Sequence, residues 1–299
     1  WPRTELVLVP RELSAAGDRV ADAEGRPVPS QRLSTGELAF AARDVPPFAA
    51  RRYAISAGAP HAEGKAEARG EVLENGALRV RLDGVTGAVV ELRARGIEED
   101  LVDAASGHAL NDYLFLQGDD LSRLERSGPA TIRLLEKGPL VASLLVESRA
   151  PGCRKLLREV RLAAGFDHLW IADTVDKERA QANPKPGDWS FAQKGGKESV
   201  SFAFPFRVPG GEVRLETPFA LMRPEADQIP GSCKNWFTAG RWADVSNGGF
   251  GVSLVTLDAP LVQVGGITAT LLGSQTNPAV WRKRVEPTQR LYVWAMNNH

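Results

Sequence analysis

Cysteine, histidine and net charge are all scarce in this chain of 299 residues, and each scarcity excludes a class of protein or site. Two cysteines, Cys153 and Cys233, cannot build a disulfide framework, and without a CxxC pair they predict two free thiols rather than a structural metal site. The 37 basic and 37 acidic residues cancel, so nothing favours nucleic acid as a partner. No apolar run approaches the ~20 residues of a membrane-spanning helix, so no membrane association is predicted.

Recognisable catalytic motifs are also absent. The four histidines, His61, His108, His168 and His299, stand in no HxH, HxD or HExxH spacing, so a metal site would need ligands from distant segments. A Cys–His dyad stays open, although no spacing favours it. The sequence contains no GxSxG, P-loop or GxGxxG motif. We therefore predict neither catalytic residues nor metal ligands in this chain.

What the chain does contain is period-2 alternation, which is typical of half-buried β-strands. In LRVRL, residues 78–82, apolar and basic side chains alternate. Similar or more fully apolar strands are predicted at LLREVRL (156–162), HLWIADTV (168–175), SVSFAFPF (199–206) and QRLYVWAM (289–296). The 29 glycines and 20 prolines punctuate these runs with turns. Many short strands joined by turns predict an all-β sandwich or barrel.

An Ala/Gly-rich stretch near residues 57–70 has no pattern and separates two β regions. We predict a small β domain over residues 1–60 and a large β-sandwich domain over residues 61–299. A second irregular stretch, residues 176–198, is long and polar, as functional or mobile loops often are. Because the first residue is Trp1 rather than Met, we expect a piece of a longer protein.

The segment HALNDYLFLQGDD, residues 108–120, carries carboxylates on both sides of an apolar run. Neighbouring residues of a strand point to opposite faces, so Asp119 and Asp120 do not suit the paired carboxylates of a glycosidase. Following Gly118, they are interpreted as turn residues, with a calcium loop as the weaker alternative.

Tryptophan is plentiful for an all-β chain, and sequence context separates core candidates from surface candidates. Trp170 and Trp294 lie within predicted strands and are expected in the core. Trp189, Trp236 and Trp281 stand beside loop residues, where an indole can stack on a sugar face. These three residues motivate one hypothesis, a stand-alone carbohydrate-binding or scaffold β-sandwich.

Several segments, in order, resemble the C-terminal β region of glycoside hydrolase family 38, the α-mannosidase family, in its bacterial type. They are VADAEGRPVPSQ and DVPPFAARRYAI near the start, ENGALRVRLDGVTGAVVELRA after the irregular stretch, and later FAFPFRVPGGEVRLETPFALMRP, GSCKNWFTAGRWADVSNGGFGVSLVTLDAP and YVWAMNNH. The resemblance covers nearly the whole chain. It implies a large two-sheet β-sandwich, of the galactose-mutarotase-like supersandwich type, preceded by the small β domain.

In that family the nucleophilic aspartate, the zinc ligands and the acid/base carboxylate belong mainly to an N-terminal barrel, which nothing here matches. The resemblance implies a fragment that supports the absent catalytic barrel, with zinc expected in that barrel and no cofactor in this chain. The implied partners are a mannoside-type carbohydrate and the protein's own N-terminal barrel and helical domains. The parent is expected to be an α-mannosidase-like glycoside hydrolase, and this chain alone is predicted to be inactive.

The run NDYLFLQG resembles a family segment whose tyrosine reaches from the β region to the sugar pocket of the barrel. Tyr113 is the matching residue, and we predict a substrate contact from it with help from Asp112 and Asn111. Trp236 is the fourth predicted sugar contact. Eukaryotic members carry an arginine where the alignment places Gly251, so that family contact is expected to be missing here.

A third hypothesis is that the chain is itself an enzyme, related to mutarotase-like or lyase-like sandwiches. This hypothesis needs a His or a Tyr/Arg/Glu cluster in one groove, and a cleft that holds His168, Tyr113 and an acidic residue would favour it. The sequence leaves all three hypotheses open.

Overall fold

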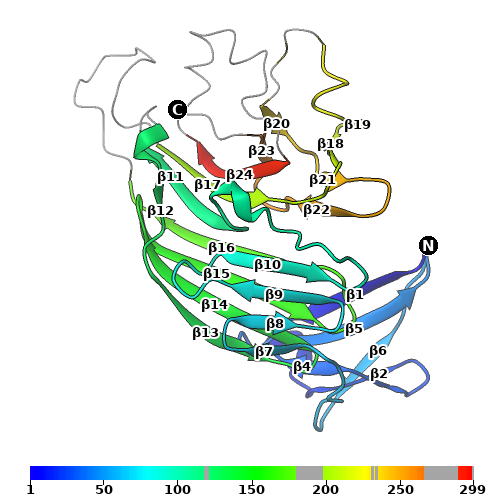
Figure 1. Ribbon diagram of the computed structural model, residues 1–299. Coiled ribbons are helices and arrows are strands. Elements are labelled where there is room, and N and C mark those ends of the chain that lie inside the picture. Colours follow the sequence, from blue (N-terminus) through cyan, green and yellow to red (C-terminus); the bar gives the residue numbers. More distant parts are fainter. Residues whose placement is uncertain (118–120, 180–197, 230–231, 233–234, 266–288, 298–299) are drawn as a thin grey trace.

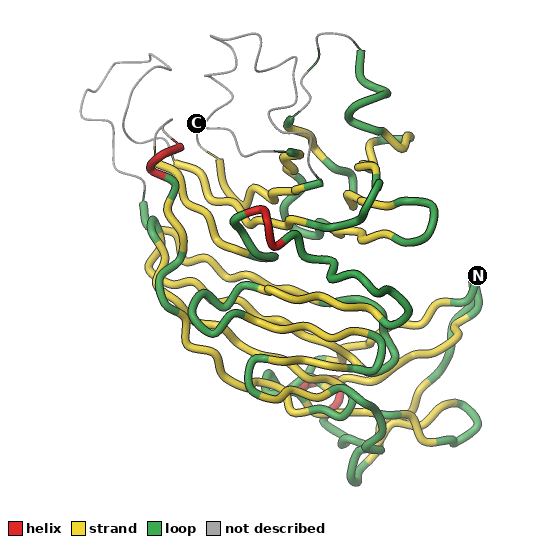
Figure 2. Tube along the Cα trace, in the orientation of Figure 1, coloured by secondary structure: helices red, strands yellow, loops and turns green. Residues whose placement is uncertain are grey.

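The computed structural model describes residues 1–117, 121–179, 198–229, 232, 235–265 and 289–297. Strands dominate this part of the chain, and its helices are three 3-10 turns, Arg11–Ser14, Ala104–Ser106 and Leu121–Arg123. The prediction of an all-β fold is therefore confirmed (Figures 1 and 2). None of the described helices is long and apolar enough to cross a membrane.

The N-terminal region consists of two antiparallel three-stranded sheets, ordered β1-β5-β4 and β3-β2-β6. Its strands are β1 (Arg3–Val9), β2 (Arg19–Asp22), β3 (Pro27–Val28), β4 (Ser30–Arg32), β5 (Leu38–Val45) and β6 (Tyr53–Ser56). Both sheets contribute to one small core, in which Val20 and Val28 pack with Leu38 and Phe40. The predicted domain boundary near residue 60 stays a prediction.

Two four-stranded antiparallel sheets follow, ordered β10-β9-β8-β7 and β13-β14-β15-β16. Their strands are β7 (Glu67–Arg69), β8 (Val72–Glu74), β9 (Leu78–Leu82), β10 (Val89–Ala94), β13 (Ala130–Lys137), β14 (Val141–Ala150), β15 (Cys153–Ala163) and β16 (Trp170–Lys177). Buried side chains of both sheets belong to one main core, with the two sheets layered as Figure 1 shows. In β9, Leu78, Val80 and Leu82 face that core while Arg79 and Arg81 face outward, as the alternation predicted.

A six-stranded antiparallel sheet continues the sandwich in the order β12-β11-β17-β24-β23-β20. Its strands are β11 (Asp112–Gln117), β12 (Glu125–Arg126), β17 (Glu198–Pro205), β20 (Trp236–Thr238), β23 (Leu261–Val264) and β24 (Arg290–Asn297). One face, with Tyr113 and Phe202, joins the main core. The other face, with Leu114, Tyr292 and Trp294, forms a separate apolar cluster, so the sheet is buried on both sides.

A smaller antiparallel sheet, ordered β19-β18-β21-β22, extends from this end of the molecule. Its strands are β18 (Glu212–Thr217), β19 (Ala220–Met222), β21 (Trp242–Ser246) and β22 (Gly251–Val255). Leu215, Ala243 and Val245 extend the main core from β18 and β21. Gly251 opens β22 opposite Ser246, and the expectation that a family arginine contact is missing at this position stays a prediction.

Side-chain hydrogen bonds join the N-terminal region to the sandwich. The Gln31 side chain donates to the Val141 carbonyl at 3.0 Å and accepts from the Leu140 and Val141 N–H groups at 3.2 and 3.0 Å. The buried Glu136 carboxylate accepts from the Ser34 backbone N–H at 2.8 Å and from its hydroxyl at 2.5 Å. These bonds join β4 and the turn after it to β13 and β14.

Candidate functional site

The start of β11 places polar side chains on both faces of the six-stranded sheet. Asn111 lies in the left-handed region at φ 60°, a conformation that asparagine tolerates better than most residues. Its backbone N–H donates to the Ala203 carbonyl at 2.7 Å, which begins the pairing of β11 with β17. Because side chains alternate along a strand, Asn111 and Tyr113 face the main core, whereas Asp112 and Leu114 face the opposite side.

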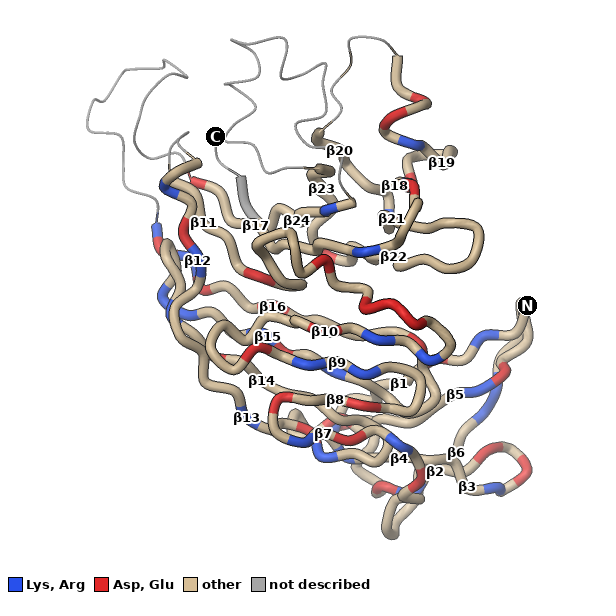
Figure 3. Tube along the Cα trace, viewed as in Figure 1, with Lys and Arg blue, Asp and Glu red and all other residues tan. Residues whose placement is uncertain are grey.

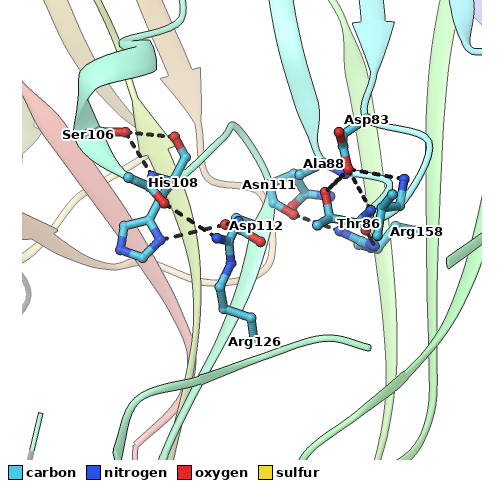
Figure 4. Close-up of polar contacts among 11 residues, drawn as sticks. Asp83, Thr86, Ala88, Ser106, His108, Asn111, Asp112, Arg126 and Arg158 are labelled. Carbon is cyan, nitrogen blue, oxygen red and sulfur yellow. Dashed lines mark hydrogen bonds and ion pairs between the residues drawn. The ribbon is translucent and has the colours of Figure 1, made fainter. Parts of the chain in front are cut away.

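On that opposite side, Asp112 forms a charged cluster with Arg126 and His108 (Figure 4). The Asp112 carboxylate is fully buried, and its Oδ2 accepts from Arg126 Nη2 and lies 3.6 Å from His108 Nδ1. Ser106 holds the histidine backbone, since its hydroxyl donates to the His108 carbonyl at 2.6 Å and accepts from the His108 N–H at 3.1 Å. The His108 ring meets Tyr292 edge-on at 6.2 Å.

Two polar atoms of this cluster are buried without a hydrogen-bond partner among the described residues. They are Asp112 Oδ1 and His108 Nδ1. A buried polar atom left unpaired costs roughly 1–3 kcal/mol, so such atoms are uncommon in a folded protein. A carboxylate oxygen accepts hydrogen bonds, and an imidazole nitrogen accepts or donates according to its tautomer. Both atoms are closed off from solvent, so a hydroxyl-bearing ligand would reach them only after the surrounding side chains move.

On the core side, Arg158 and Asp173 form a second polar network beneath the first. Arg158 is fully buried on β15, and its guanidinium donates to the Asn111 carbonyl at 3.1 Å and to the Thr86 carbonyl. Asn111 Nδ2 donates to Asp173 Oδ1 at 2.8 Å, and Asp173 lies opposite Arg158 in the register of β16 with β15. Although solvent reaches Asp173, partial desolvation raises its pKa to about 6, against the opposing effects of Asn111 and Arg158.

The turn between β9 and β10 shapes this network. Asp83 Oδ1 accepts from the Thr86 N–H at 2.7 Å and from the Thr86 hydroxyl at 2.9 Å, and these bonds lower the pKa of Asp83. Gly87 follows at φ 70°, where a Cβ atom would lie 2.2 Å from Val146 Cγ1 and 3.0 Å from Arg158 Nη2. The turn therefore needs glycine at position 87 to bring its carbonyl groups to the buried arginine.

Tyr113, the first predicted sugar contact, lies in the main core. Its side chain is fully buried and packs edge-on against Phe202 at 5.8 Å. Its hydroxyl donates to the Pro151 carbonyl at 2.6 Å, and burial raises the pKa of Tyr113. In this conformation the Tyr113 hydroxyl is engaged within the sandwich.

The structure divides the four predicted contacts between the two faces of the sheet. Asn111 and Tyr113 face the main core. Trp236 is half-buried on β20 and packs against the apolar cluster on the same face as Asp112. Cys153 is a buried free thiol. Other candidate residues lie outside the described part of the chain, namely Asp119, Asp120, Trp189, Cys233, Trp281 and His299.

The sequence reasoning missed four charged or titratable partners, His108, Arg126, Arg158 and Asp173. One signal was available, because Arg158 occupies an inward position of LLREVRL, in step with Leu156, Val160 and Leu162. A lone arginine on an apolar face indicates a buried charge with partners. Arg126 gave no comparable signal, because its contact with Asp112 depends on the pairing of β11 with β12.

The described residues do not form the cleft of His168, Tyr113 and an acidic residue that would favour the third hypothesis. Tyr113 contacts Pro151 just before β15, whereas His168 follows the far end of that strand. The eleven residues of β15 span about 35 Å at the usual rise of a strand. The described residues also contain no group of three or more His, Cys, Asp or Glu side chains that could hold a metal ion.

Comparisons with known proteins identify relatives of the sandwich. The family profile described as "Glycosyl hydrolases family 38 C-terminal domain" matches residues 73–264. Two solved structures from Enterococcus faecalis share the fold, an alpha-mannosidase from strain V583 and a protein in the glycosyl hydrolase family 38. Each covers 99% of this chain at a TM-score of 0.61 and 12% identity, while this chain spans only 38% and 39% of theirs. Curated protein sequences give no match.

Proposed function

This chain belongs to glycosyl hydrolase family 38 through its C-terminal domain, and on that basis we propose that it is the C-terminal β-sandwich part of an α-mannosidase-like glycoside hydrolase. The observation that carries the proposal is the coverage, since nearly the whole chain superposes on less than two-fifths of each solved relative. In this proposal the catalytic carboxylates and a zinc ion belong to a barrel outside the chain. The sandwich supports that barrel and lends it a sugar contact.

We assign the sugar contact to the side of β11 that carries Asp112. Oδ1 of Asp112 and Nδ1 of His108 have no hydrogen-bond partner among the described residues, and a mannoside hydroxyl would reach these buried atoms once the side chains around them move, with Arg126 paired to the carboxylate. Asn111 and Tyr113 act from beneath as supports, because their side chains bond Asp173 and the Pro151 carbonyl. Trp236, on the same face of the sheet, offers an aromatic surface.

Activity assays test whether catalysis needs both the barrel and the sandwich. The isolated chain, incubated with an aryl α-mannoside and zinc, is expected to give no turnover above the blank. Coexpression with the barrel of its parent is expected to yield a complex that hydrolyses the substrate. Turnover by the repurified chain alone would overturn the proposal, as would an active parent barrel that neither needs nor binds the sandwich.

A matched pair of variants tests the sugar contact in the complete parent enzyme. Asp112→Asn is expected to lower kcat/KM about tenfold or more, because one charged hydrogen bond to the sugar is lost. Asp258→Asn removes an exposed carboxylate between β22 and β23 and is expected to leave kcat/KM unchanged. Equal kcat/KM values for the two variants, with unchanged thermal unfolding, would show that Asp112 does not contact the sugar.

The aromatic cluster favours a second candidate function, a stand-alone carbohydrate-binding module. Trp236 remains half-exposed beside Tyr292 and Trp294, as a stacking residue would be. Titration of the isolated chain with mannose oligosaccharides, followed by tryptophan fluorescence, separates the two functions. Saturable binding that disappears in Trp236→Ala would favour the binding module, whereas a flat titration supports a domain that works only with its barrel.

A further inference from the structure

A recess of about 520 Å³ opens where the N-terminal region meets one end of the sandwich. Thr4 of β1 and Arg43 of β5 line one side. The other side comes from the segment before β7, the turn between β8 and β9, the residue after β10 and the turn between β15 and β16. Ligand sites are commonly found at such junctions, and known pockets measure roughly 300–1,000 Å³.

Three cations from separate segments converge on this recess. They are Arg43, Lys65 and Arg95, and no hydrogen bond or ion pair engages their side chains among the described residues. Asp167 also lines the recess, but its side chain is 96% exposed and lies beside His168. The basic segments are visible on β5 and at the end of β10 (Figure 3). Three like charges in one recess repel one another, the exposed Asp167 offsets only part of this, and a bound anion would relieve the remaining repulsion.

Two of these cations lie over glycine turns. A Cβ atom on Gly165 would be 3.0 and 3.1 Å from the two terminal nitrogens of Arg43, so the guanidinium rests against the backbone there. A Cβ atom on Gly76 would be 3.7 Å from Lys65 Cδ, so the lysine stem crosses that turn. Both glycines have a φ near +80°, at 82° and 81°. The missing side chains allow the two charged groups to approach the recess from opposite turns.

An aromatic wall completes the recess. Phe166 and His168 line it, and their rings lie 5.3 Å apart at 80°. His168 also packs on Trp170 with ring centroids 4.1 Å apart. Mutual packing fixes these rings, and a fixed aromatic face suits the C–H groups of an organic ligand.

From this arrangement we propose that the recess binds an oxyanion, the phosphate or sulfate group of a small organic ester. Arg43, Lys65 and Arg95 hold the anion, and the organic part lies against Phe166 and His168. Guanidinium groups present two parallel donors to such oxygens, and lysine supplies a point charge. The site is independent of the α-mannosidase assignment, because it lies at the far end of β15 from Pro151, the residue that Tyr113 contacts.

Calorimetric titration of the 299-residue chain tests this site with three probes, inorganic phosphate, glucose 6-phosphate and glucose. Both anions are expected to bind saturably, and glucose is not. Tighter binding of the ester assigns the site to a phosphorylated organic ligand, whereas equal affinities assign it to free oxyanion. Added sodium chloride is expected to weaken binding, because it screens the exposed cations.

Matched variants locate the binding. Arg95→Gln is expected to raise Kd for glucose 6-phosphate about tenfold or more, since a charged hydrogen bond is lost. Arg133→Gln, on β13 and outside the recess, is expected to leave Kd unchanged. Neither exposed arginine is expected to alter thermal unfolding of the ligand-free chain. Absence of saturable anion binding, or equal Kd values for the two variants, would overturn the proposal.

Chemical protection gives a readout that needs no variant. Glucose 6-phosphate is expected to slow the reaction of Lys65 with an amine-reactive reagent, while Lys137, an exposed lysine at the end of β13, reacts at its ordinary rate. Equal labelling of Lys65 with and without the ester would contradict the assignment.

Discussion

Two aspartates on β16, Asp173 and Asp176, have opposite electrostatic surroundings. Desolvation raises the pKa of Asp173 to about 6, although the Asn111 hydrogen bond and the Arg158 charge oppose it. The hydrogen bond from Arg154 lowers the pKa of Asp176. Two carboxylates on one strand therefore favour folding in different pH ranges.

We expect Asp173→Asn to be more stable than the wild type at neutral pH and to lose that advantage on acidification. A carboxyl whose pKa is raised in the folded state binds more protons when folded, so its contribution to stability falls as pH rises from 3.8 toward about 6. Asparagine keeps an oxygen that accepts from Asn111 but carries no charge to desolvate. Urea unfolding of both proteins across this pH range measures the difference.

Asp176→Asn is the control on the same strand, and its expected trend has the opposite sign. A carboxyl whose pKa is lowered in the folded state stabilises that state at pH values above its unfolded pKa. This contribution is lost as the pH falls through the folded pKa, so the variant is less stable than the wild type at neutral pH only. A constant difference between Asp173→Asn and the wild type at every pH would contradict a raised pKa for Asp173.

At the scale of the elements, the alternation of apolar and polar residues predicted the strands best. β9 was predictable because only one of its faces is buried, so apolar and basic residues alternate along it. For β11 the direction of each side chain was not predictable, because both faces are buried and the run from Tyr113 to Leu116 is apolar throughout. Without alternation, the sequence could not show that Tyr113 faces the main core and Asp112 the other side.

The candidate site was half predictable for a related reason. Asn111 and Asp112 stood out as polar residues beside an apolar run, and the structure places both in buried polar networks. Their partners Arg126 and Arg158 follow 14 and 47 residues later and reach them only through strand pairing. A single sequence does not show how strands so far apart align with one another. The partners in these networks could therefore be identified only from the structure.

The turn between β9 and β10 supports an element-scale prediction. Gly87→Ala is expected to lower the free energy of unfolding by about 2 kcal/mol or more, because its Cβ atom would overlap Val146 of β14 and strain a left-handed φ. Gly84→Ala, in the same turn, has nothing within 4 Å of its Cβ position and is expected to change stability by less than about 0.5 kcal/mol. Urea unfolding measures both, and equal losses would refute close packing at Gly87.

At the scale of the whole molecule, Gln31 couples the N-terminal region to the sandwich. We expect Gln31→Ala to cost about 2 kcal/mol or more, because the Leu140 and Val141 N–H groups at the start of β14 lose their acceptor, while the Val141 carbonyl still accepts from the Gly138 N–H. Hydrogen exchange followed by mass spectrometry is expected to quicken in residues 3–56 more than in β13–β16. Gln228→Ala is the control, because its side-chain bond to Met222 stays within a local loop. An equal increase of the exchange rate in both regions would contradict a role of Gln31 in holding the N-terminal region to the sandwich.

The position of β24 has a consequence for how the protein is made. This strand, Arg290–Asn297, lies inside the six-stranded sheet, between β17 and β23. The ribosome synthesises it after every other strand of that sheet, so β17 and β23 wait with unpaired edges until these residues emerge. Unpaired strand edges invite pairing with other chains. The six-stranded sheet therefore stays open between β17 and β23 until β24 is synthesised, which leaves two strand edges of the nascent chain exposed to pairing with other chains.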